Sequence, residues 1–333
     1  MTKELKEIEL FAGAGGLALG LEIAGFKNIA CIEIDKNASE TLRLNRPNWN
    51  IINKDISEVS SQNLEKLFNI KKGELDLLSG GAPCQPFSYA GKKLGLEDTR
   101  GTLFYHYATF LKKLQPKMFI FENVKGLLTN NNGKSFETIK SIFEEENYNI
   151  QYKVLNANDY NVPQNRYRLI VIGIRKDLDI SFTFPKEYEY KPVLKDVLED
   201  CPKSEGSTYS EKKLKYFKYI PEGGNWTNLP KELIDEYVPK NLRGGSRGCL
   251  RRLDRNAPSL TILTSPQQKL TERCHYAELR PLTIRESARI QSFPDNYKFV
   301  GSMSSQYKQI GNAVPVKLAE AVGKELYKSL TEE

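Results

Sequence analysis

The sequence is poor in the residues that most often bind metals or form cross-links. Its 333 residues include two histidines and five cysteines, and the cysteines are dispersed without a Cys-x-x-Cys pair. A structural zinc site is therefore not expected, and neither is a disulfide-stabilised secreted domain. The sequence also lacks an apolar run near the roughly 20 residues of a membrane-spanning helix, and its first residues show no signal-peptide pattern. These absences predict a cytoplasmic protein that needs neither a membrane nor a metal.

The net charge of +7 is concentrated in one stretch. Residues 241–280 hold seven arginines and one lysine but only three acidic residues, and they include Gly244, Gly245 and Gly248. Arginine suits phosphates and guanine edges better than lysine does, and glycine lets the backbone approach a ligand closely. The stretch predicts contact with nucleic acid. The alternative is an ordinary solvated surface, which is what most charge runs are.

The first residues predict a strand, a glycine turn and a helix. An apolar strand at 7–11 is followed by the turn 12–16 and by a helix at 17–24 that ends at Gly25. This order opens a doubly wound nucleotide-binding fold, in which backbone amides at the helix N-terminus face an anion. The glycine spacing is not Gly-x-Gly-x-x-Gly. A pyrophosphate is therefore not specifically indicated, and a carboxylate such as that of S-adenosylmethionine would serve equally well.

Acidic residues end the next two predicted strands, at 28–35 and 51–56. A carboxylate about 20 residues after the glycines reads ribose hydroxyls in this architecture, and Glu33 is the first choice for it. Asp35 is the fallback or a helix cap. Asp55 is placed to accept a hydrogen bond from an adenine amino group while Ile56 packs on the ring. Acids at strand ends are more often loop formers or caps, so that alternative stays open.

Cys84 stands between Pro83 and Pro86, just after a predicted buried strand at 75–78. The prolines restrict the backbone, so the cysteine is expected on a stiff turn beyond a strand end, where open α/β sheets bind ligands. A thiol at such a position is a candidate nucleophile. The alternative is a small buried cysteine that fills a gap, and the residues alone leave the two interpretations about equal.

Three further charged residues are predicted at strand ends. The strand at 117–124 ends in Glu122-Asn123, so Glu122 faces the same site as Cys84 or caps the following segment. Arg166 and Arg168 precede a strand at 169–174 and, being two residues apart, would point the same way. Such a pair could grip a phosphate, a carboxylate or a base carbonyl, or could simply be solvated. From about residue 181 the alternation of strands and helices breaks down, which predicts a second domain.

Six motifs occur in a fixed order along the chain. They are Phe-x-Gly-x-Gly-Gly at 11–16, Pro-Cys-Gln at 83–85, Glu-Asn-Val at 122–124, Gln-x-Arg-x-Arg at 164–168, an Arg-Glu helix at 285–286 and Gly-Asn-Ala-Val at 311–314. With these motifs the chain closely resembles the bacterial DNA (cytosine-5)-methyltransferases of restriction-modification systems, over nearly its full length except about residues 186–265.

The resemblance implies an α/β fold, with a doubly wound class I S-adenosylmethionine-dependent methyltransferase sheet and a second, smaller DNA-recognition domain. It divides the chain into a discontinuous catalytic and cofactor-binding domain at 1–185 plus 300–333, a target-recognition domain at 186–280 and a bridging helix at 281–299. By the same resemblance the glycine-flanked residues 86–100 form a loop that closes over the substrate.

The implied reaction transfers a methyl group from S-adenosylmethionine to carbon 5 of a cytosine flipped out of the DNA, at a cost of a few kcal/mol of lost stacking and pairing. By resemblance, the Cys84 thiolate attacks carbon 6 while Glu122 holds or protonates ring nitrogen 3, so that carbon 5 can take the methyl group. A base then removes the carbon-5 proton and the thiolate leaves. Arg168, with Arg166 as its candidate partner, fixes the base carbonyl.

The remaining site assignments are expectations of the same kind. The expected cofactor contacts are Phe11, Gly13, Gly16, Glu33, Ile34, Asp55, Ile56, Pro83, Leu103, Asn312 and Val314. The expected DNA contacts are Ser88, Arg100, Arg243, Arg247, Arg251, Arg252, Gln267, Gln268 and Lys269, of which the last three are candidates for base edges. We expect a monomer that acts on double-stranded DNA in the nucleoid, with a cognate restriction endonuclease as a separate protein.

Three other functions are compatible with parts of the sequence. An RNA cytosine methyltransferase shares the fold, but a basic domain between two catalytic halves favours duplex DNA. A catalytically silent DNA-binding protein is disfavoured by the presence of Cys84, Glu122 and Arg168 together. A nicotinamide oxidoreductase is disfavoured by the glycine spacing and the rigid Pro-Cys-Gln turn.

Overall fold

The structure is a computed structural model that describes residues 4–82, 99–237, 248–268 and 271–332, with only the backbone for 99–102. Several residues singled out from the sequence lie outside this description. They are Pro83, Cys84, Ser88, Arg243, Arg247, Lys269 and the side chain of Arg100.

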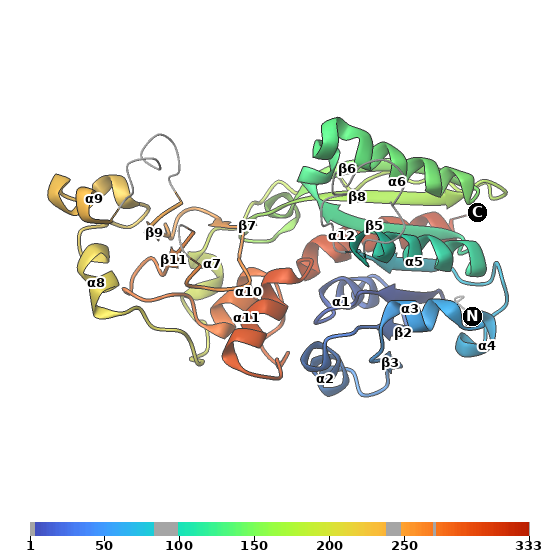
Figure 1. Cartoon of the computed structure of the whole chain (residues 1–333), viewed down its shortest axis with the longest axis horizontal. Coiled ribbons are helices and arrows are strands. Elements are labelled where there is room, and N and C mark those ends of the chain that lie inside the picture. Colours follow the sequence, from blue (N-terminus) through green and yellow to red (C-terminus); the bar gives the residue numbers. More distant parts are fainter. Residues whose placement is uncertain (1–3, 83–98, 238–247, 269–270, 333) are drawn as a thin grey trace.

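A seven-stranded sheet in the order β3-β2-β1-β4-β5-β8-β6 forms the larger of two lobes (Figure 1). The strands are β1 (Lys6–Leu10), β2 (Lys27–Ile32), β3 (Ile51–Ile52), β4 (Leu77–Gly80), β5 (Met118–Val124), β6 (Tyr148–Asn156) and β8 (Tyr167–Arg175). The first five are parallel, and β8 runs antiparallel to its neighbours β5 and β6. The strand order reverses between β1 and β4, which is where open sheets bind ligands. The doubly wound sheet predicted from the sequence is confirmed.

Both faces of the sheet are covered by helices, which is why its parallel strands are continuous apolar runs. In β5, Phe119 and Phe121 pack on one face with Phe110 of α5 (Thr99–Leu114) and Phe143 of α6 (Lys134–Glu145). Ile120 lies in the core of the other face. That core also contains Leu17 and Leu21 of α1 (Gly16–Ile23) and Leu318 and Val322 of α12 (Val316–Thr331).

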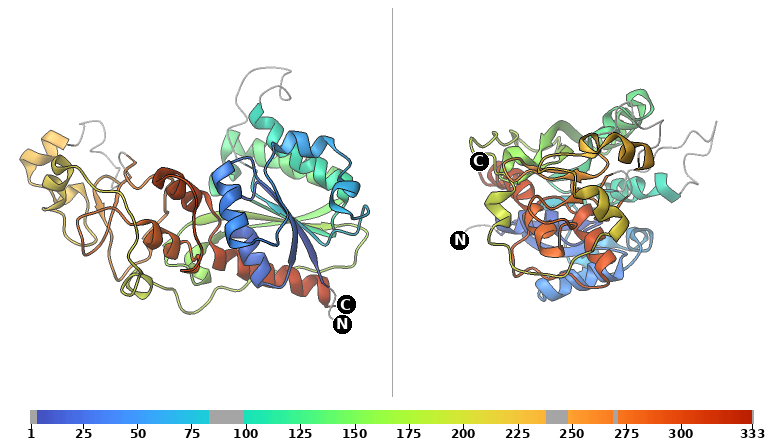
Figure 2. Two further views of the ribbon diagram at one scale, coloured as in Figure 1. Left: turned by 90° about the horizontal axis from the view of Figure 1, so that it is seen from below. Right: turned by 90° about the vertical axis from the view of Figure 1, so that its left-hand side faces the viewer.

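The C-terminal helix α12 belongs to the sheet lobe, although the second lobe precedes it in the chain. A Cβ atom at Gly20 of α1 would lie 2.4 Å from the Cβ atom of Ala319 in α12, so the two helices approach closely. Figure 2 shows α12 lying along the sheet, next to α1. The sequence after Pro315 predicts a final helix at residues 316–330, which α12 confirms. The chain crosses twice between the lobes.

The strand predicted at residues 51–56 is too long. β3 contains only Ile51 and Ile52, because Asp55 accepts a hydrogen bond from the Ser57 backbone N–H and begins α3 (Ile56–Ser61). Asp35 likewise begins α2 (Lys36–Asn45), so its predicted capping role is confirmed. Several short helices were not predicted, among them α3, α4 (Leu64–Phe68) and α7 (Lys195–Leu198).

The second lobe is built from short elements around a core of its own (Figure 1). Its helices are α8 (Glu211–Phe217) and α9 (Lys231–Tyr237), and its strands are β9 (Arg251–Arg252), β10 (Ser259–Leu260) and β11 (Arg273–Cys274). The core includes Tyr216, Phe217, Trp226 and Leu250. β10 pairs with β7 (Gln164–Asn165), which immediately precedes the sheet strand β8, so the two lobes share backbone hydrogen bonds.

Two helices lie between the lobes, α10 (Ile284–Ile290) and α11 (Met303–Asn312). The sequence predicts a helix here that Thr283 caps and Pro294 ends. Thr283 does cap α10, and together with Glu286 it forms a capping box. The predicted end at Pro294 is wrong, because the helix already ends at Ile290 and Gln291 is its C-cap. Helix α11 was not predicted. The backbone that follows its last residue, Asn312, leads to the edge of the sheet.

Candidate functional site

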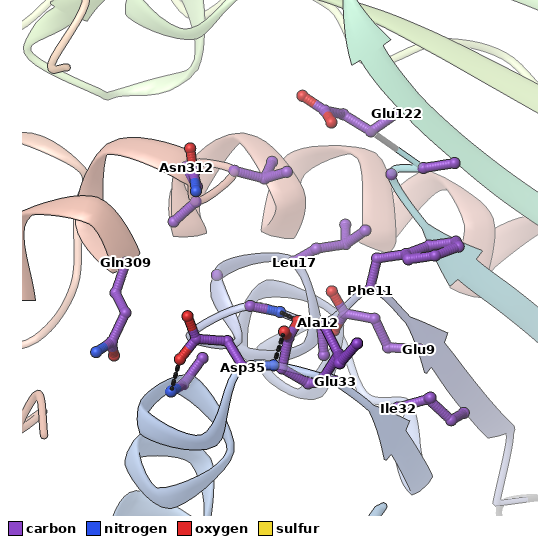
Figure 3. Close-up of a pocket in the computed structure, with 18 of the residues that line it drawn as sticks. Glu9, Phe11, Ala12, Leu17, Ile32, Glu33, Asp35, Glu122, Gln309 and Asn312 are labelled. Atoms are coloured by element: carbon purple, nitrogen blue, oxygen red, sulfur yellow. Dashed lines mark hydrogen bonds between the residues drawn. The ribbon is translucent and has the colours of Figure 1, made fainter. Parts of the chain in front are cut away.

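A cavity of about 810 Å³ lies at the carboxyl ends of the parallel strands (Figure 3). Its volume is in the range of small-molecule sites. Residues that follow β1, β2 and β4 line it, together with Glu122 of β5 and the end of α11. Of the residues singled out from the sequence, those that line the cavity are Phe11, Gly13, Gly16, Glu33, Ile34, Asp55, Ile56, Leu103, Glu122, Arg166, Arg168, Asn312 and Val314.

In the glycine turn after β1, Gly13 borders open space and Gly16 is in tight contact with a neighbouring segment. Gly13 has φ +55°, and a Cβ atom there would meet nothing within 4 Å, so the backbone borders open space. Gly16 is different, because its Cβ atom would lie 2.2 Å from the carbonyl oxygen of Val314. Phe11 also has a positive φ of 57°, which is strained for an aromatic residue and typical of functional sites. The turn is therefore held in an unusual conformation beside the cavity.

Glu33 is fixed by two backbone hydrogen bonds. Its Oε2 accepts from the Gly13 N–H at 2.7 Å and its Oε1 from the Asp35 N–H at 2.7 Å. The residue is buried, and desolvation raises the pKa of its carboxyl group against the lowering effect of these hydrogen bonds. Each oxygen has a further lone pair, so the fixed carboxylate can still accept hydrogen bonds from a ligand.

The two other acids on this side of the cavity serve as helix caps. Asp35 caps α2 and pairs with Lys308 at 3.3 Å. Asp55 caps α3 through its Oδ1. Ile34 and Ile56 lie beside them; Ile34 is 64% exposed, which is unusual for a large apolar side chain and leaves it free to pack on a planar ligand. Capping fixes the acids in place without removing them from the cavity lining.

Glu122 lies at the opposite end of the lining from Glu33 (Figure 3), and it forms an ion pair with Arg168. The Nε of Arg168 lies 2.6 Å from Oε1 of Glu122, and each side chain is only 13% exposed. The pair arises from sheet register, because β8 runs antiparallel to β5 and places Arg168 opposite Val124. Arg168 also donates from Nη1 to the carbonyl of Tyr167 at 2.9 Å. An oriented carboxylate thus lies at the edge of the cavity.

The start of the segment that carries Cys84 is anchored beside this carboxylate. The Asn123 side-chain amide donates to the carbonyl of Ala82 at 3.1 Å. At Gly81 a Cβ atom would lie 2.7 Å from Oε2 of Glu122, so a larger residue there would displace the Glu122 carboxylate. Cys84 itself lies outside the described residues. Asn123 was not assigned a role from the sequence, although its position next to Glu122 was noted.

Arg166 differs from the expectation that it and Arg168 grip a ligand together. It is 2% exposed, and its terminal nitrogens donate to the carbonyls of Ile262 at 3.3 Å and Gly311 at 2.9 Å. Burial, and then the charge of Arg168, lower the pKa of Arg166 to about 9, so it is still protonated at neutral pH. Its guanidinium group joins the second lobe and the end of α11 to the sheet.

Two buried glutamines extend this junction between the lobes. Gln164 accepts from the Ile262 N–H at 2.9 Å and donates to the side chain of Gln291 at 2.8 Å. Gln291 in turn donates to the carbonyls of Ile310 at 2.6 Å and Ala313 at 3.1 Å. Sequence reasoning did not assign a role to either glutamine, because each one's partners are distant in the chain.

Some polar side chains of the basic segment at 241–280 already have hydrogen-bond partners within the protein. Arg252 donates to the carbonyls of Tyr276 at 2.9 Å, Ile220 at 3.0 Å and Ala277 at 3.3 Å, which is a structural role. The side-chain amide of Gln267 donates to Ser207 and to the carbonyl of Thr208. Both side chains have partners within the protein, because the short strands here leave carbonyls that they satisfy. Their contact with DNA stays a prediction.

Arg251 and Gln268 remain candidates for DNA contact. Arg251 is half-buried and Gln268 is exposed. The described part of the chain contains no group of three or more His, Cys, Asp or Glu side chains arranged to hold a metal ion. None of its helices combines the length and apolarity needed to cross a membrane.

Glu9 is a cavity-lining residue that sequence reasoning missed. It lies on β1, is 3% exposed, and its Oε2 has no hydrogen-bond partner among the described residues. A glutamate inside a strand that should be buried on both faces was the available signal, and the same holds for Glu7. Glu7 differs in that Asn28 and Ser79 donate to its two oxygens.

Comparison with known proteins agrees with this geometry. A family model described as C-5 cytosine-specific DNA methylase matches residues 5–328. The Type II methyltransferase M.Sau96I of Staphylococcus aureus is 51% identical over 331 residues, which cover 98% of this chain and 76% of that protein. The Type II methyltransferase M.PspPI of Psychrobacter sp. (strain TA137) is 50% identical, with 97% of this chain and 79% of that protein covered.

Solved structures show the same fold. A prophage-encoded protein of Escherichia coli has a TM-score of 0.75 at 27% identity and covers 99% of this chain and 100% of its own. The DNMT2 protein of Spodoptera frugiperda has a TM-score of 0.72 at 20% identity, with 97% of this chain and 100% of that chain covered, and this likeness concerns the fold alone. The chain therefore belongs to the C-5 cytosine-specific DNA methylase family, and the protein is a DNA (cytosine-5)-methyltransferase.

Proposed function

We propose that this enzyme methylates cytosines within a specific double-stranded DNA sequence, with S-adenosylmethionine as methyl donor, as the modification enzyme of a type II restriction-modification system. Relatives of the type II class are 49–51% identical and match nearly the whole chain. In this role it works as a monomer, and the cognate endonuclease is a separate protein. The observation that carries the proposal is the Glu122–Arg168 ion pair, which lines the same cavity as Glu33 and the glycine turn.

The cavity fits a nucleoside that carries a charged amino-acid chain. Glu33, fixed by the Gly13 and Asp35 amides, is the expected acceptor for ribose hydroxyls. Ile34 and Ile56 offer apolar surface for an adenine ring, with Asp55 beside them. The open backbone at Gly13 suits a carboxylate at the start of α1. S-adenosylmethionine has all these parts, and when bound it supplies an electrophilic methyl group on a cationic sulfur.

Cys84 is the proposed nucleophile, and covalent geometry keeps it near this site. It lies two positions after Ala82, with only Pro83 between them, so their Cα atoms are at most about 7 Å apart. Ala82 is anchored by Asn123, which adjoins Glu122. A thiolate brought to carbon 6 of a flipped cytosine forms a carbon–sulfur bond and pushes electron density toward carbon 5.

Glu122 is the proposed partner of ring nitrogen 3. With Arg168 bound to Oε1, the other oxygen, Oε2, lies toward Gly81 at the start of the Cys84 segment. Holding a proton at nitrogen 3 makes the ring electrophilic enough for sulfur to attack carbon 6. We assign Arg168 mainly to orienting Glu122, with its second terminal nitrogen left to donate to the base carbonyl. After carbon 5 is methylated, loss of its proton to a base expels the thiolate and restores the ring.

Three parts of the chain have different tasks in this proposal. Residues 1–185 plus 300–333 supply the chemistry, 186–280 read the DNA, and 281–299 bridge the two. Arg166 positions this assembly, because its guanidinium group holds Ile262 of the second lobe and Gly311 at the edge of the cavity. Arg251 and Gln268 are the described residues that we retain as DNA contacts, together with the undescribed Ser88, Arg243, Arg247 and Lys269 and the side chain of Arg100.

Bisulfite sequencing of plasmid DNA from cells that express this chain tests the proposal. The expected result is protection of one cytosine in every copy of a single short sequence, and none in cells that express Cys84→Ser. Purified enzyme with labelled S-adenosylmethionine should label duplex DNA but not tRNA. Random cytosine protection, or labelling of tRNA in place of duplex DNA, would contradict the proposed substrate.

A further inference from the structure

The cavity contains a buried carboxyl group to which the mechanism gives no task. Glu9 projects from β1 among Phe11, Leu17 and Ile32, all of which line the cavity (Figure 3). One of its oxygens accepts the backbone N–H of Ala18, and the other, Oε2, is buried without a partner among the described residues. Leaving such an atom unpaired is costly. It therefore has a function or a missing partner.

The charged groups around Glu9 are acids. Glu7 acts on it from the same strand, Glu33 from the end of β2 and Glu122 from β5. The charge of Glu9 also acts on Cys31 of β2 and on Tyr297, which follows α10 in the chain. Neither of these residues is a cation. Burial first, and then these acids, hold the pKa of Glu9 well above its usual range. In the empty cavity these effects favour the neutral form of the carboxyl group.

The cations of the lining are Lys54, Arg166, Arg168 and Lys308, and no contact between any of them and Glu9 is found among the described residues. Lys308 is paired with Asp35, Arg168 with Glu122, and Arg166 donates to the carbonyls of Ile262 and Gly311. Two buried acids of the lining, Glu9 and Glu33, accept hydrogen bonds from backbone N–H groups. Neither carboxyl group is paired with a cation among the described residues. A cation in the cavity would offset the repulsion that keeps Glu9 protonated.

We propose that Glu9 is the charge-sensing residue of the methyl-donor site, and that it gives up its proton when the cationic donor binds. The step is balanced: the carboxyl group becomes a carboxylate, the proton passes to solvent, and the negative charge remains opposite a positive group of the ligand. Two groups of S-adenosylmethionine have this charge, the sulfonium and the α-ammonium. The inference rests on the proposed use of that donor.

Coupling of donor binding to proton release from Glu9 has a functional consequence. If the sulfonium is the group detected, the ionised Glu9 favours the donor over the uncharged thioether product, which would help the product to leave. If the ammonium is detected, donor and product benefit equally. A neutral amide at this position could accept the Ala18 N–H but could not respond to charge.

Isothermal titration calorimetry tests this directly. Binding of S-adenosylmethionine is measured at one pH in phosphate and in Tris, whose ionisation enthalpies differ, so that the difference in heat counts released protons. Wild type should release up to about one proton per donor bound. Glu9→Gln should release markedly fewer and bind about tenfold more weakly, since a charge-assisted contact is lost. Glu9→Asp, which can still ionise, should keep the release and guards against a folding defect in the amide variant.

Glu7→Gln is the matched control. It removes a buried carboxyl group from the same strand, but one whose oxygens are satisfied by Asn28 and Ser79 and which is not part of the cavity lining. Donor binding to this variant should still release a proton, because Glu9 is intact. Titration with S-adenosylhomocysteine shows which positive group acts on Glu9. If this ligand releases fewer protons than the donor does, the group is the sulfonium, and if it releases equally many, the group is the ammonium.

Two results would overturn the inference in different ways. Tight binding of the donor without proton release, or with release that persists in Glu9→Gln, would remove the role of Glu9 but leave the proposed function intact. Absence of any binding of S-adenosylmethionine to a folded enzyme would overturn the proposed donor and this inference together.

Discussion

Replacing Arg168 by methionine tests whether this arginine works through Glu122. The Nε–Oε1 distance of 2.6 Å corresponds to an attraction of about 6 kcal/mol at an effective dielectric constant of about 20, before desolvation. Both side chains are largely buried, and removing one partner of a buried pair typically costs about 3–5 kcal/mol. We take the lower end because desolvation offsets part of the attraction. A loss of about 3 kcal/mol in orienting Glu122 slows methyl transfer about 100-fold.

The double mutant distinguishes positioning from an independent role. Glu122→Gln alone should slow the reaction by about 10² to 10⁴, the usual range for a positioned acid or base. If Arg168 acts by orienting Glu122, adding Arg168→Met to Glu122→Gln should cost little more. Arg168→Lys keeps a charge but loses the planar fork, and should fall between wild type and Arg168→Met.

Single-turnover transfer of a tritiated methyl group to duplex DNA is the assay, with enzyme in excess so that product release does not contribute. Donor affinity, measured by calorimetry, should be unchanged in all four variants, because Glu33 and the glycine turn are intact. Losses that multiply in the double mutant would refute the positioning role and would favour a separate bond from Arg168 to the base carbonyl.

Three further predictions concern packing and pH. Gly16→Ala places a Cβ atom 2.2 Å from the Val314 carbonyl and should lower both the melting temperature and donor affinity more than Gly13→Ala, which meets nothing within 4 Å; equal effects would contradict the packing role of Gly16. Arg166→Met leaves the carbonyls of Ile262 and Gly311 without their donor and should lower the free energy of unfolding by about 1–3 kcal/mol in a urea titration, whereas an unchanged midpoint would argue against the junction. Burial raises the pKa of Glu7 from 4.5 to about 8, so the folded protein keeps a proton that the unfolded chain has lost, and the free energy of unfolding should fall as pH rises from about 4.5 to about 8. Glu7→Gln should flatten that slope in denaturation curves measured across this range, and an unchanged slope would exclude Glu7 as its source.

The sheet and its connections could be predicted because they depend on local patterns. β5 is an apolar run that ends in Glu122-Asn123, and the turn at Gly13 and Gly16 lies between an apolar strand and a helix. Each pattern specifies an element without knowledge of its neighbours. Strand ends of a doubly wound sheet meet at one edge, so the convergence of Phe11, Glu33 and Glu122 on one cavity followed from topology.

The partners of buried polar side chains could not be predicted in this way. Arg166 and Arg252 look like ligand-binding arginines in the sequence, but each donates to carbonyls that only the tertiary fold brings near. Glu9 was overlooked for the same reason, because its significance lies in the absence of a partner for one oxygen. Pairings of this kind depend on contacts between distant segments, and a single sequence does not encode them in any local signal.

Covalent trapping on DNA that contains 5-fluorocytosine tests the mechanism most directly. Fluorine at carbon 5 cannot leave as a proton does, so the bond between the Cys84 sulfur and carbon 6 persists after methyl transfer. The mechanism predicts one DNA strand bound covalently per enzyme molecule, only with S-adenosylmethionine present, with the modified peptide containing Cys84 and slower trapping in Glu122→Gln. Methylation of ordinary DNA by Cys84→Ser at the wild-type rate, or an active wild-type enzyme that forms no adduct, would contradict it.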